Sequence, residues 1–212
     1  MAVPIRIVLA DDHVLVRQGL KSLLEREQFQ VVAEASDGQE AVRASESLHP
    51  DIVVIDISMP LLNGIEAVRE LGRSCPKTKA ILLTQHEEDQ YIREALEAGA
   101  KGYVLKNQAA SDLVHAIQQV SRGQFYLSPG ISRAVVEAYR TKSDSPADPL
   151  TGRERQVLQL IAEGKSTKDA ASLLGISVKT AESHRMNLMQ KLDIHETASL
   201  VRYAVRRGLV QP

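Results

Sequence analysis

The chain has 212 residues, of which 43 % are apolar and 25 % are charged, and this composition is ordinary for a soluble protein with one large or two small domains. Its apolar runs are too short to span a bilayer, its N-terminus lacks the pattern of a secretory leader, and its single cysteine excludes an internal disulfide, so we expect a cytoplasmic protein with no membrane partner. The formal net charge is −1, but residues 1–148 hold 16 basic and 21 acidic residues whereas residues 149–212 hold 10 and 6, so only the C-terminal part is expected to meet a polyanion.

The first 122 residues alternate between a strand-like and a helix-like hydrophobic period. Segments with apolar residues at helical spacing, such as the one that contains Leu113 and Ile117, separate short runs rich in β-branched residues. These runs are Ile5–Leu9, Val31–Ala35, Ile52–Asp56, Ala80–Leu83 and Gly102–Leu105. Five strands that alternate with five helices predict an α/β domain with a doubly wound, five-stranded parallel sheet.

The pattern changes after residue 122. Apolar residues between Ile131 and Tyr139 predict one more short helix, and residues 141–149 then combine polar residues with two prolines, as linkers do. Four helical segments without a strand signal follow. We therefore predict that residues 1–122 form the α/β domain, residues 123–147 a helical extension and linker, and residues 148–212 an all-α domain of four helices.

Five polar residues stand where the predicted strands end. Ligands bind outside the carboxyl ends of the strands in an open parallel sheet, so these side chains are expected to lie together. They are Asp11 and Asp12 after the first strand, Asp56 at the end of the third, Thr84 after the fourth and Lys106 after the fifth. Three neighbouring carboxylates repel one another and need a cation, and Mg²⁺ suits them because it prefers carboxylate, water and phosphate oxygens.

The chemistry expected of this pocket is attack by a carboxylate on phosphorus, which gives an aspartyl phosphate. Asp56 is the natural nucleophile because it lies on the central strand and leaves Asp11 and Asp12 free to hold the metal. Lys106 would neutralise one phosphoryl oxygen, and the Thr84 hydroxyl would donate to another. A single aspartate at a strand end is often only a turn residue, but five polar residues at successive strand ends are hard to attribute to chance.

Residues 4–122 resemble the receiver domain of bacterial response regulators, which has a flavodoxin-like fold. The likeness rests on the acidic pair, on Asp56-Ile-Ser-Met-Pro-Leu-Leu-Asn-Gly64, on Leu83-Thr84 and on Gly102-Tyr-Val-Leu-Lys106. It implies that a sensor histidine kinase phosphorylates Asp56, and that Mg²⁺ is bound by the acidic pair, by Asp56 and by the backbone carbonyl of Ser58. It also implies a switch in which Thr84 moves towards the phosphoryl group and Tyr103 turns inward.

Three positions depart from that family or vary within it. Gln85 follows the switch threonine, where the family usually has a small residue, and this leaves open a regulator that is active without phosphate. Ser58 and His86 occupy positions that tune dephosphorylation, so the sequence does not give the lifetime of the phosphorylated state. His13 follows the acidic pair directly but lacks the helical-bundle setting of a relay histidine, and no phosphate relay is expected of it.

The basic C-terminal part contains repeated signals for helix starts. Capping boxes are predicted at Thr151–Glu154 and Ser166–Asp169, and Ser177 is expected to cap a third helix that runs to about Leu192. The glycine-containing turn between the second and third helices predicts a helix-turn-helix, although a generic three-helix bundle would give the same pattern.

Residues 148–211 resemble the LuxR-type helix-turn-helix of the NarL/FixJ response regulators. The matching stretches are Leu150-Thr-Gly-Arg-Glu-Arg-Gln-Val-Leu158, Ile176-Ser-Val-Lys-Thr-Ala-Glu-Ser-His-Arg185 and Lys191-Leu192. The resemblance implies DNA contacts by Lys179, Thr180, Glu182, Ser183, Arg185 and Lys191. It also implies that the last helix pairs two subunits as a homodimer on an inverted repeat, through Leu200, Val201 and Ala204, although core packing within one subunit explains these three residues equally well.

The sequence thus predicts a phosphorylation-controlled, sequence-specific transcriptional regulator that is not an enzyme and for which RNA polymerase is a possible partner. A magnesium-dependent phosphatase of the haloacid dehalogenase type is the main alternative, but it needs a second aspartate where this chain has Ser58. A receiver joined to a protein-binding or RNA-binding module is a further alternative.

Overall fold

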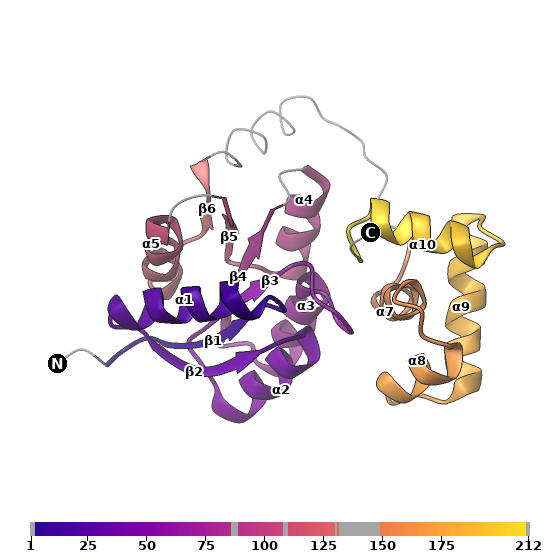
Figure 1. Ribbon diagram of the computed structural model, residues 1–212, viewed down its shortest axis with the longest axis horizontal. Coiled ribbons are helices and arrows are strands. Elements are labelled where there is room, and N and C mark those ends of the chain that lie inside the picture. The colour runs from indigo at the N-terminus through magenta and orange to yellow at the C-terminus, as the bar shows by residue number, and fades with distance from the viewer. Residues whose placement is uncertain (1–2, 86–88, 108–109, 130, 132–148, 211–212) are drawn as a thin grey trace. The chain divides into compact units, whose positions relative to one another are not determined.

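The computed structural model describes residues 3–85, 89–107, 110–129, 131 and 149–210. The chain separates into two compact units, one N-terminal and one C-terminal to residue 145 (Figure 1). Within the described residues, no helix has both the length and the apolar content that are needed to cross a bilayer.

The N-terminal unit is built on a sheet in which every neighbouring pair of strands is parallel. Its strands are β1 (Arg6–Ala10), β2 (Gln30–Ala35), β3 (Ile52–Asp56), β4 (Lys79–Thr84), β5 (Gly102–Leu105) and β6 (Tyr126–Leu127). Its helices are α1 (Val14–Arg26), α2 (Gly38–Leu48), α3 (Gly64–Ser74), α4 (Asp89–Ala98) and α5 (Ala110–Ser121). The strand order β2-β1-β3-β4-β5-β6 confirms the predicted doubly wound α/β fold.

The prediction of five strands needs a correction, because the sheet has six. The sixth strand, β6, lies in the segment that was predicted as a helical extension and linker. With only two residues it is too short to produce an alternating pattern in the sequence. The helix predicted between Ile131 and Tyr139 lies outside the described residues except for Ile131, which is buried.

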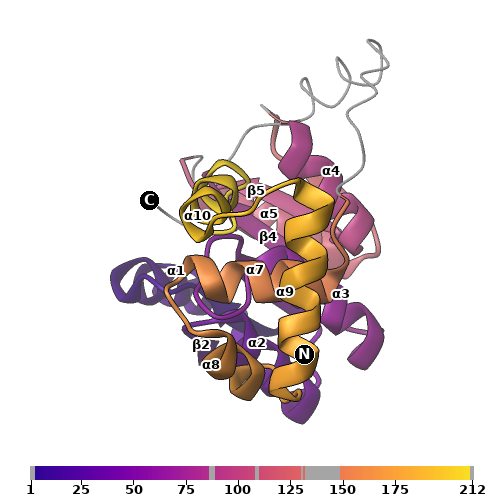
Figure 2. The same cartoon turned by 90° about the vertical axis from the view of Figure 1, so that its right-hand side faces the viewer.

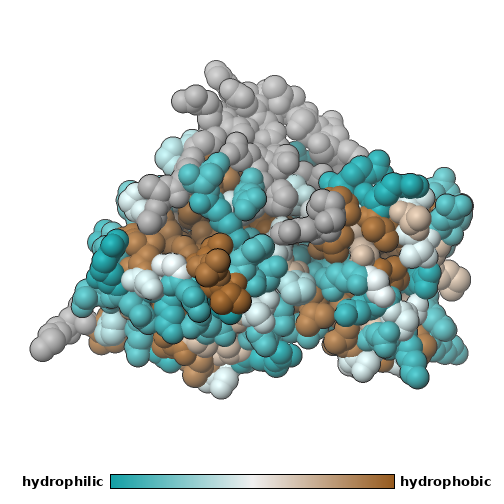
Figure 3. Space-filling model, in the orientation of Figure 1, coloured by the Kyte–Doolittle hydropathy of each residue, from teal (hydrophilic) through white to brown (hydrophobic). Residues whose placement is uncertain are grey.

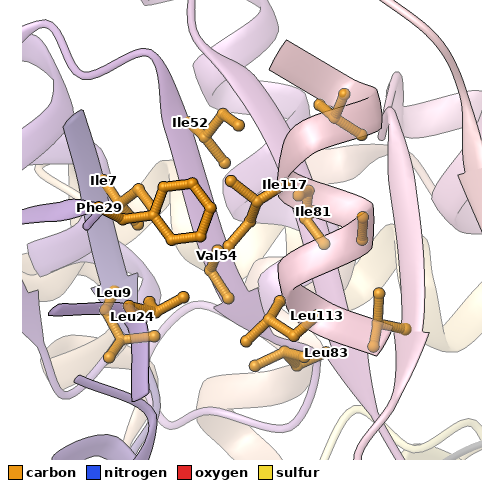
Figure 4. Packing of buried hydrophobic residues seen from close by; sticks show 13 residues of the cluster. Ile7, Leu9, Leu24, Phe29, Ile52, Val54, Ile81, Leu83, Leu113 and Ile117 are labelled. Atoms are coloured by element: carbon orange, nitrogen blue, oxygen red, sulfur yellow. The ribbon is translucent and has the colours of Figure 1, made fainter. Parts of the chain in front are cut away.

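Side chains from alternate positions of the central strands form a core beneath α1 and α5 (Figure 4). Ile7, Ile52 and Ile81 come from three neighbouring strands and pack with Phe29 and with Ile117 of α5. Helices α2, α3 and α4 lie on the opposite side of the sheet (Figure 1). Both faces of β3 are therefore covered, which explains why all five of its residues are buried and why it reads as one continuous apolar run.

The chain leaves β1 in one direction to reach β2 and continues in the other direction from β3 to β4. The carboxyl ends of β1 and β3 therefore lie side by side at the point where the strand order reverses. A crevice forms at such a point because the connections leave its two strands in opposite directions. The fold thus brings the acidic pair after β1 next to the last residue of β3.

The described residues of the C-terminal unit, 149–210, form four helices, as predicted: α7 (Gly152–Ala162), α8 (Thr167–Leu173), α9 (Val178–Leu192) and α10 (Thr197–Arg206). Both predicted capping boxes are present, and the Ser177 side chain accepts a hydrogen bond from the Thr180 main-chain N–H at the start of α9. Figure 2 shows α9 with α8 beside its N-terminal end and α10 near its C-terminal end. A buried cluster that includes Val157, Leu188 and Leu200 holds the helices together.

Candidate functional site

Four of the five polar residues predicted to meet at the strand ends, Asp11, Asp12, Asp56 and Lys106, form a cluster, called the pocket below, in which the lysine bridges two carboxylates. Lys106 Nζ lies 2.7 Å from Asp11 Oδ2 and 2.8 Å from Asp56 Oδ2. Asp11 is fully buried, and Asp56 is 4 % exposed. One half-buried cation therefore bridges the ends of β1 and β3, and the main-chain bond between Lys106 N and Thr84 O, 2.7 Å long, helps to hold it after β5.

Burial dominates the ionisation of Asp56. It raises the pKa of this carboxyl from 3.8 to about 6, although Lys106 acts in the opposite direction, and the charges of Asp11 and Asp12 raise the pKa further. Burial lowers the pKa of Lys106, but the attraction of Asp56 and Asp11 outweighs it, and the net shift is upward. The pocket thus has an excess of negative charge that one ammonium group does not neutralise.

Three carboxylates and one imidazole supply possible metal ligands. Ligand atoms of Asp11, Asp12, His13 and Asp56 all lie within 4.8 Å of one another. Carboxylate oxygens gathered at this spacing suit a hard divalent cation such as Mg²⁺. Ser58, whose backbone carbonyl was predicted as a further ligand, is half-buried two residues after Asp56.

His13 contacts both members of the acidic pair, and the sequence analysis assigned it no role. Its main-chain N–H donates to Asp11 Oδ1 at 2.9 Å, and its ring Nδ1 lies 2.7 Å from Asp12 Oδ1. Arg17 was also missed, and its guanidinium donates to the main-chain oxygen of Asp11 at 2.5 Å. In the sequence, only its position next to the acidic pair pointed to a role for His13. Arg17 lies one helical turn further along α1, and the same proximity was the only sequence signal for it.

The loop after Asp56 is packed so closely that it requires a glycine. A Cβ atom at Gly64 would lie 2.1 Å from the carbonyl oxygen of Asp56. The Gly64 main-chain N–H donates to Ile57 O at 2.9 Å, which draws the start of α3 against the backbone that carries the acceptor carboxylate. Asn63 caps α3 through the Glu66 N–H and thereby directs the chain away from the pocket.

The two predicted switch residues are both inside the protein. Thr84 is fully buried at the end of β4, and Tyr103 of β5 is 1 % exposed. The inward position of the Tyr103 ring is the one that the resemblance assigns to the phosphorylated state. Gln85 is exposed, and His86 lies outside the described residues.

The predicted DNA contacts occupy the exposed side of α9. Lys179, Thr180, Glu182 and Ser183 are exposed in its N-terminal half. Lys179, Glu182, Ser183 and Met186 follow one another at helical spacing, and Met186 is 65 % exposed. A helix that presents this stripe of basic, acidic, hydroxyl and apolar groups has the variety needed to read base edges in a major groove.

Two of the predicted DNA contacts also hold the unit together. The Arg185 guanidinium donates to Thr167 Oγ1 and to Thr197 Oγ1, both at 3.0 Å, and so ties α9 to the starts of α8 and α10. Lys191 Nζ donates to Glu154 Oε2 at 2.7 Å. Burial raises the pKa of Glu154, but the bonds from Lys191 and Thr151 outweigh it and lower the pKa of this carboxyl overall.

The residues predicted to form a dimer interface are mostly inside one subunit. Leu200 and Ala204 are fully buried in the core of the C-terminal unit, and Val201 is half-buried. Core packing within one subunit, the alternative to a dimer interface, therefore explains why Leu200 and Ala204 are apolar.

Comparison with protein families agrees with this division into an α/β unit that carries the acidic pocket and a helical unit. Residues 7–118 match the response regulator receiver domain, and residues 148–204 match the bacterial regulatory proteins of the luxR family. The chain is a response regulator of the NarL/FixJ family. Members of this family are transcriptional regulators that combine a receiver domain with a LuxR-type DNA-binding domain.

Similar proteins match this response regulator along almost its whole length. The transcriptional regulatory protein MctR of Rhizobium johnstonii is 39 % identical, and the match covers 97 % of this chain and 95 % of MctR. The oxygen regulatory protein NreC of Staphylococcus epidermidis is 37 % identical, with 97 % and 99 % covered. RcsB of Salmonella enterica serovar Typhimurium, solved on promoter P1flhDC in the presence of the phosphomimetic BeF3⁻, is 28 % identical with a TM-score of 0.64 and 95 % and 98 % covered.

Proposed function

We propose that this response regulator accepts one phosphoryl group on Asp56 and that the modification controls how its C-terminal unit binds double-stranded DNA. The observation that carries the proposal is the pocket in which the buried Asp56, beside Asp11 and Asp12, lies 2.8 Å from the half-buried Lys106 ammonium. In this proposal residues 1–122 act as the receiver and residues 148–212 as the DNA-binding domain, with residues 123–147 between them.

The proposed cofactor is Mg²⁺. Asp11, Asp12 and Asp56 would hold it together with the backbone carbonyl of Ser58, and three carboxylates gathered beside a single ammonium group favour a cation there. When bound, Mg²⁺ neutralises carboxylate charge and polarises the oxygens of the incoming phosphoryl group.

In the proposed reaction, a sensor histidine kinase presents a phosphohistidine to the pocket. An Asp56 oxygen attacks phosphorus, the new P–O bond forms as the P–N bond breaks, and the imidazole leaves with the electron pair and takes a proton from solvent. The Lys106 ammonium exchanges its contact with Asp56 for a hydrogen bond to a phosphoryl oxygen, and the Thr84 hydroxyl donates to another phosphoryl oxygen. Both groups then stabilise a charge that was absent before the transfer.

The kinase would approach over the first turn of α1, which directly follows the acidic pair. Apolar side chains gather over α1 in Figure 3. Val14, Leu15 and Val16 are 53 %, 84 % and 39 % exposed, so three consecutive apolar side chains are accessible here. A partner that covers them would bring its phosphohistidine next to Asp12 while burying apolar surface.

The DNA-binding part of the proposal rests on α9. Lys179 and Arg185 carry the charge that phosphates or guanine attract, and Glu182 accepts from cytosine. Arg185 and Lys191 would exchange part of their present bonds for bonds to DNA, and Thr180 and Ser183 would contribute hydroxyl groups. The structure of RcsB on promoter DNA supports this use of the domain.

A homodimer on an inverted repeat is part of the same proposal, because two recognition helices bind half-sites one helical turn apart more tightly than one helix binds alone. Val201 is the accessible member of the three predicted interface residues. RNA polymerase would be the downstream partner at the promoter.

The test uses the intact protein with acetyl phosphate and Mg²⁺, followed by intact mass measurement and gel shift on DNA selected from a random pool. We expect the mass of one phosphoryl group and tighter DNA binding, and both should be lost in Asp56→Asn. Asp51→Asn, which changes an exposed aspartate near the same strand, is the matched control and should behave as wild type. A phosphoryl group that persists in Asp56→Asn would show that another residue is the acceptor.

The DNA contacts are tested by salt titration. Lys179→Ala should lower the affinity and reduce the slope of log affinity against log salt by about 1, because one phosphate contact is lost. Lys101→Ala removes an exposed lysine of the N-terminal unit and should leave the slope unchanged. Equal slopes in wild type and Lys179→Ala would contradict the assignment of Lys179 to a phosphate.

A further inference from the structure

Ser128 follows the short sixth strand and bonds to β5 with both its main chain and its side chain. Its main-chain N–H donates to Tyr103 O at 3.0 Å, and its hydroxyl oxygen accepts from the Leu105 main-chain N–H at 3.2 Å. Ser128 is fully buried. Ser128 therefore satisfies two main-chain groups on the outer side of β5, the Tyr103 carbonyl and the Leu105 N–H. Its side chain takes the place of the next main-chain hydrogen bond that a longer β6 would make.

A carboxylate holds Ser128 in this position. The Ser128 hydroxyl donates to Asp112 Oδ2 at 2.5 Å, and the Tyr126 hydroxyl donates to Asp112 Oδ1. Asp112 lies in the first turn of α5, where the helix dipole favours a negative charge. Both oxygens of one carboxylate thus bind the two ends of the segment 126–128, and bonds to an ionised acceptor are stronger than those between neutral groups. Asp112, Tyr126 and Ser128 are called the Asp112 latch below.

The Asp112 latch lies one peptide away from the proposed phosphorylation chemistry. The Leu105 N–H that it binds precedes Lys106, whose ammonium contacts Asp11 and Asp56. On the other side of β5, towards β4, Lys106 N donates to Thr84 O. The end of β5 is therefore held between the switch threonine on one side and Ser128 on the other.

Ser128 also directly follows β6, the last strand of the sheet, and precedes the chain that leads to the DNA-binding helices. We propose that the Asp112 latch is a positioning element: it fixes the end of β5 and transmits a change of Lys106 and Tyr103 into the chain that follows Ser128. This inference rests on the proposed function, because it describes the route by which phosphate at Asp56 alters DNA binding. A coupling element of this kind must have bonds to both the site and the chain that follows, and Ser128 bonds to Leu105 beside Lys106 and, through its carbonyl oxygen, to the Ile131 main-chain N–H at 2.9 Å.

The alternative is that the latch only closes the edge of the sheet. A purely structural role would make the protein less stable after mutation but would leave the effect of phosphate on DNA binding unchanged, because every remaining folded molecule would still respond. The decisive quantity is therefore the ratio of DNA affinities with and without phosphate, measured in the full-length protein under conditions where it is folded.

The experiment compares wild type with Ser128→Ala. Phosphorylation by acetyl phosphate and Mg²⁺ is followed by intact mass, and DNA affinity is followed by fluorescence anisotropy on a duplex selected by the phosphorylated wild type. We expect phosphate to raise wild-type affinity by about 5- to 150-fold and that of Ser128→Ala by about twofold or less. The initial rate of phosphorylation should stay within about threefold of wild type, because Lys106 keeps its carboxylate partners.

Two further variants keep the test decisive. Tyr126→Phe removes one bond to Asp112 but leaves Ser128 bound to Leu105, so it should give an intermediate ratio, and it serves in place of Ser128→Ala if that variant does not fold. Ser121→Ala is the matched control, since its hydroxyl makes a local bond to Gln118 O within α5. Amide hydrogen exchange of the β5 peptide should accelerate in Ser128→Ala and remain slow in Ser121→Ala.

The outcomes separate the two proposals. If wild type takes up phosphate without a gain in DNA affinity, the proposed function is wrong. If wild type gains affinity and Ser128→Ala gains as much, the latch does not couple the units and the inference is overturned. A Ser128→Ala variant that folds but accepts no phosphate would also overturn it, because Ser128 would then act on the acceptor site alone.

Discussion

Replacing Asp56 by asparagine should make the protein more stable, because the wild-type carboxylate is ionised at a cost. Burial raises the pKa of Asp56 from 3.8 to about 6. A carboxyl with a higher pKa in the folded chain than in the unfolded chain is harder to ionise when folded, so its charge destabilises the fold above that range. At ~1.4 kcal/mol for each pKa unit, the destabilisation at pH 7 is about 3 kcal/mol. Asn keeps the shape of the side chain and removes the charge.

The effect has a defined pH window. Below about pH 4 the carboxyl is protonated in both states, so Asp56→Asn and wild type should be equally stable, and the difference should grow between pH 4 and 6 and remain constant above. Urea unfolding in EDTA, followed by far-ultraviolet circular dichroism at pH 4 and pH 7, measures it. Mg²⁺ should stabilise wild type more than the variant.

Asp193→Asn is the control, since the side chain of Asp193 is 96 % exposed and asparagine tolerates the left-handed backbone found there. Its free energy of unfolding should differ from wild type by less than about 0.5 kcal/mol at either pH. The reasoning fails if Asp56→Asn is no more stable than wild type at pH 7, or if its advantage is the same at pH 4.

Further changes test other contacts of the two units. Gly64→Ala should destabilise the N-terminal unit by about 3 kcal/mol and slow phosphorylation, because the new Cβ would lie 2.1 Å from the Asp56 carbonyl oxygen; unchanged urea unfolding would contradict this. His13→Ala should weaken Mg²⁺ binding by about tenfold in titration calorimetry, whereas His13→Asn, which can still donate to Asp12, should come closer to wild type; equal affinities in all three proteins would remove His13 from the metal site. Met186→Ala should abolish any preference for thymine over uracil in a selected DNA site, since the exposed Met186 side chain offers apolar contact to the thymine methyl group. A preference that survives in this variant would show that another residue contacts the methyl group.

The pocket was predictable because the apolar runs marked the strands so clearly. The predicted bounds of the third strand, Ile52–Asp56, are those of β3, and the polar residue that ends each run lies at the carboxyl edge of the sheet. The capping boxes of α7 and α8 were predictable for another reason: the residues that make them are three positions apart and need no partner from elsewhere in the chain.

Contacts between distant residues, and strands too short to have a period, were not predictable. The bond between Lys191 and Glu154 joins residues 37 positions apart. No local pattern in the sequence distinguishes a lysine that binds such a distant carboxylate from an unpaired lysine that would bind a DNA phosphate. β6 has two residues and is held by main-chain bonds that any sequence could make. Leu200 and Ala204 show the same limit, because an apolar helix face has the same spacing whether its own core or a second subunit covers it.

The ionisation of Asp56 and the proposed switch have the same physical source. A pocket that contains three carboxylates and one ammonium group is under-neutralised, and the charges of Asp11 and Asp12 add to burial, the main cause, in raising the pKa of Asp56. A cation would relieve the excess of negative charge, and a phosphoryl group would then add about −1.5 to −2 charge at the same place and compete for Lys106. Because Lys106 is held through the end of β5, a change in its partners must act on that strand, and the strand is bonded to Ser128 on its outer edge. In the proposed route, a change at the pocket therefore reaches the chain beyond Ser128 through the contact of Lys106 with Asp56 and the bond between Leu105 and Ser128.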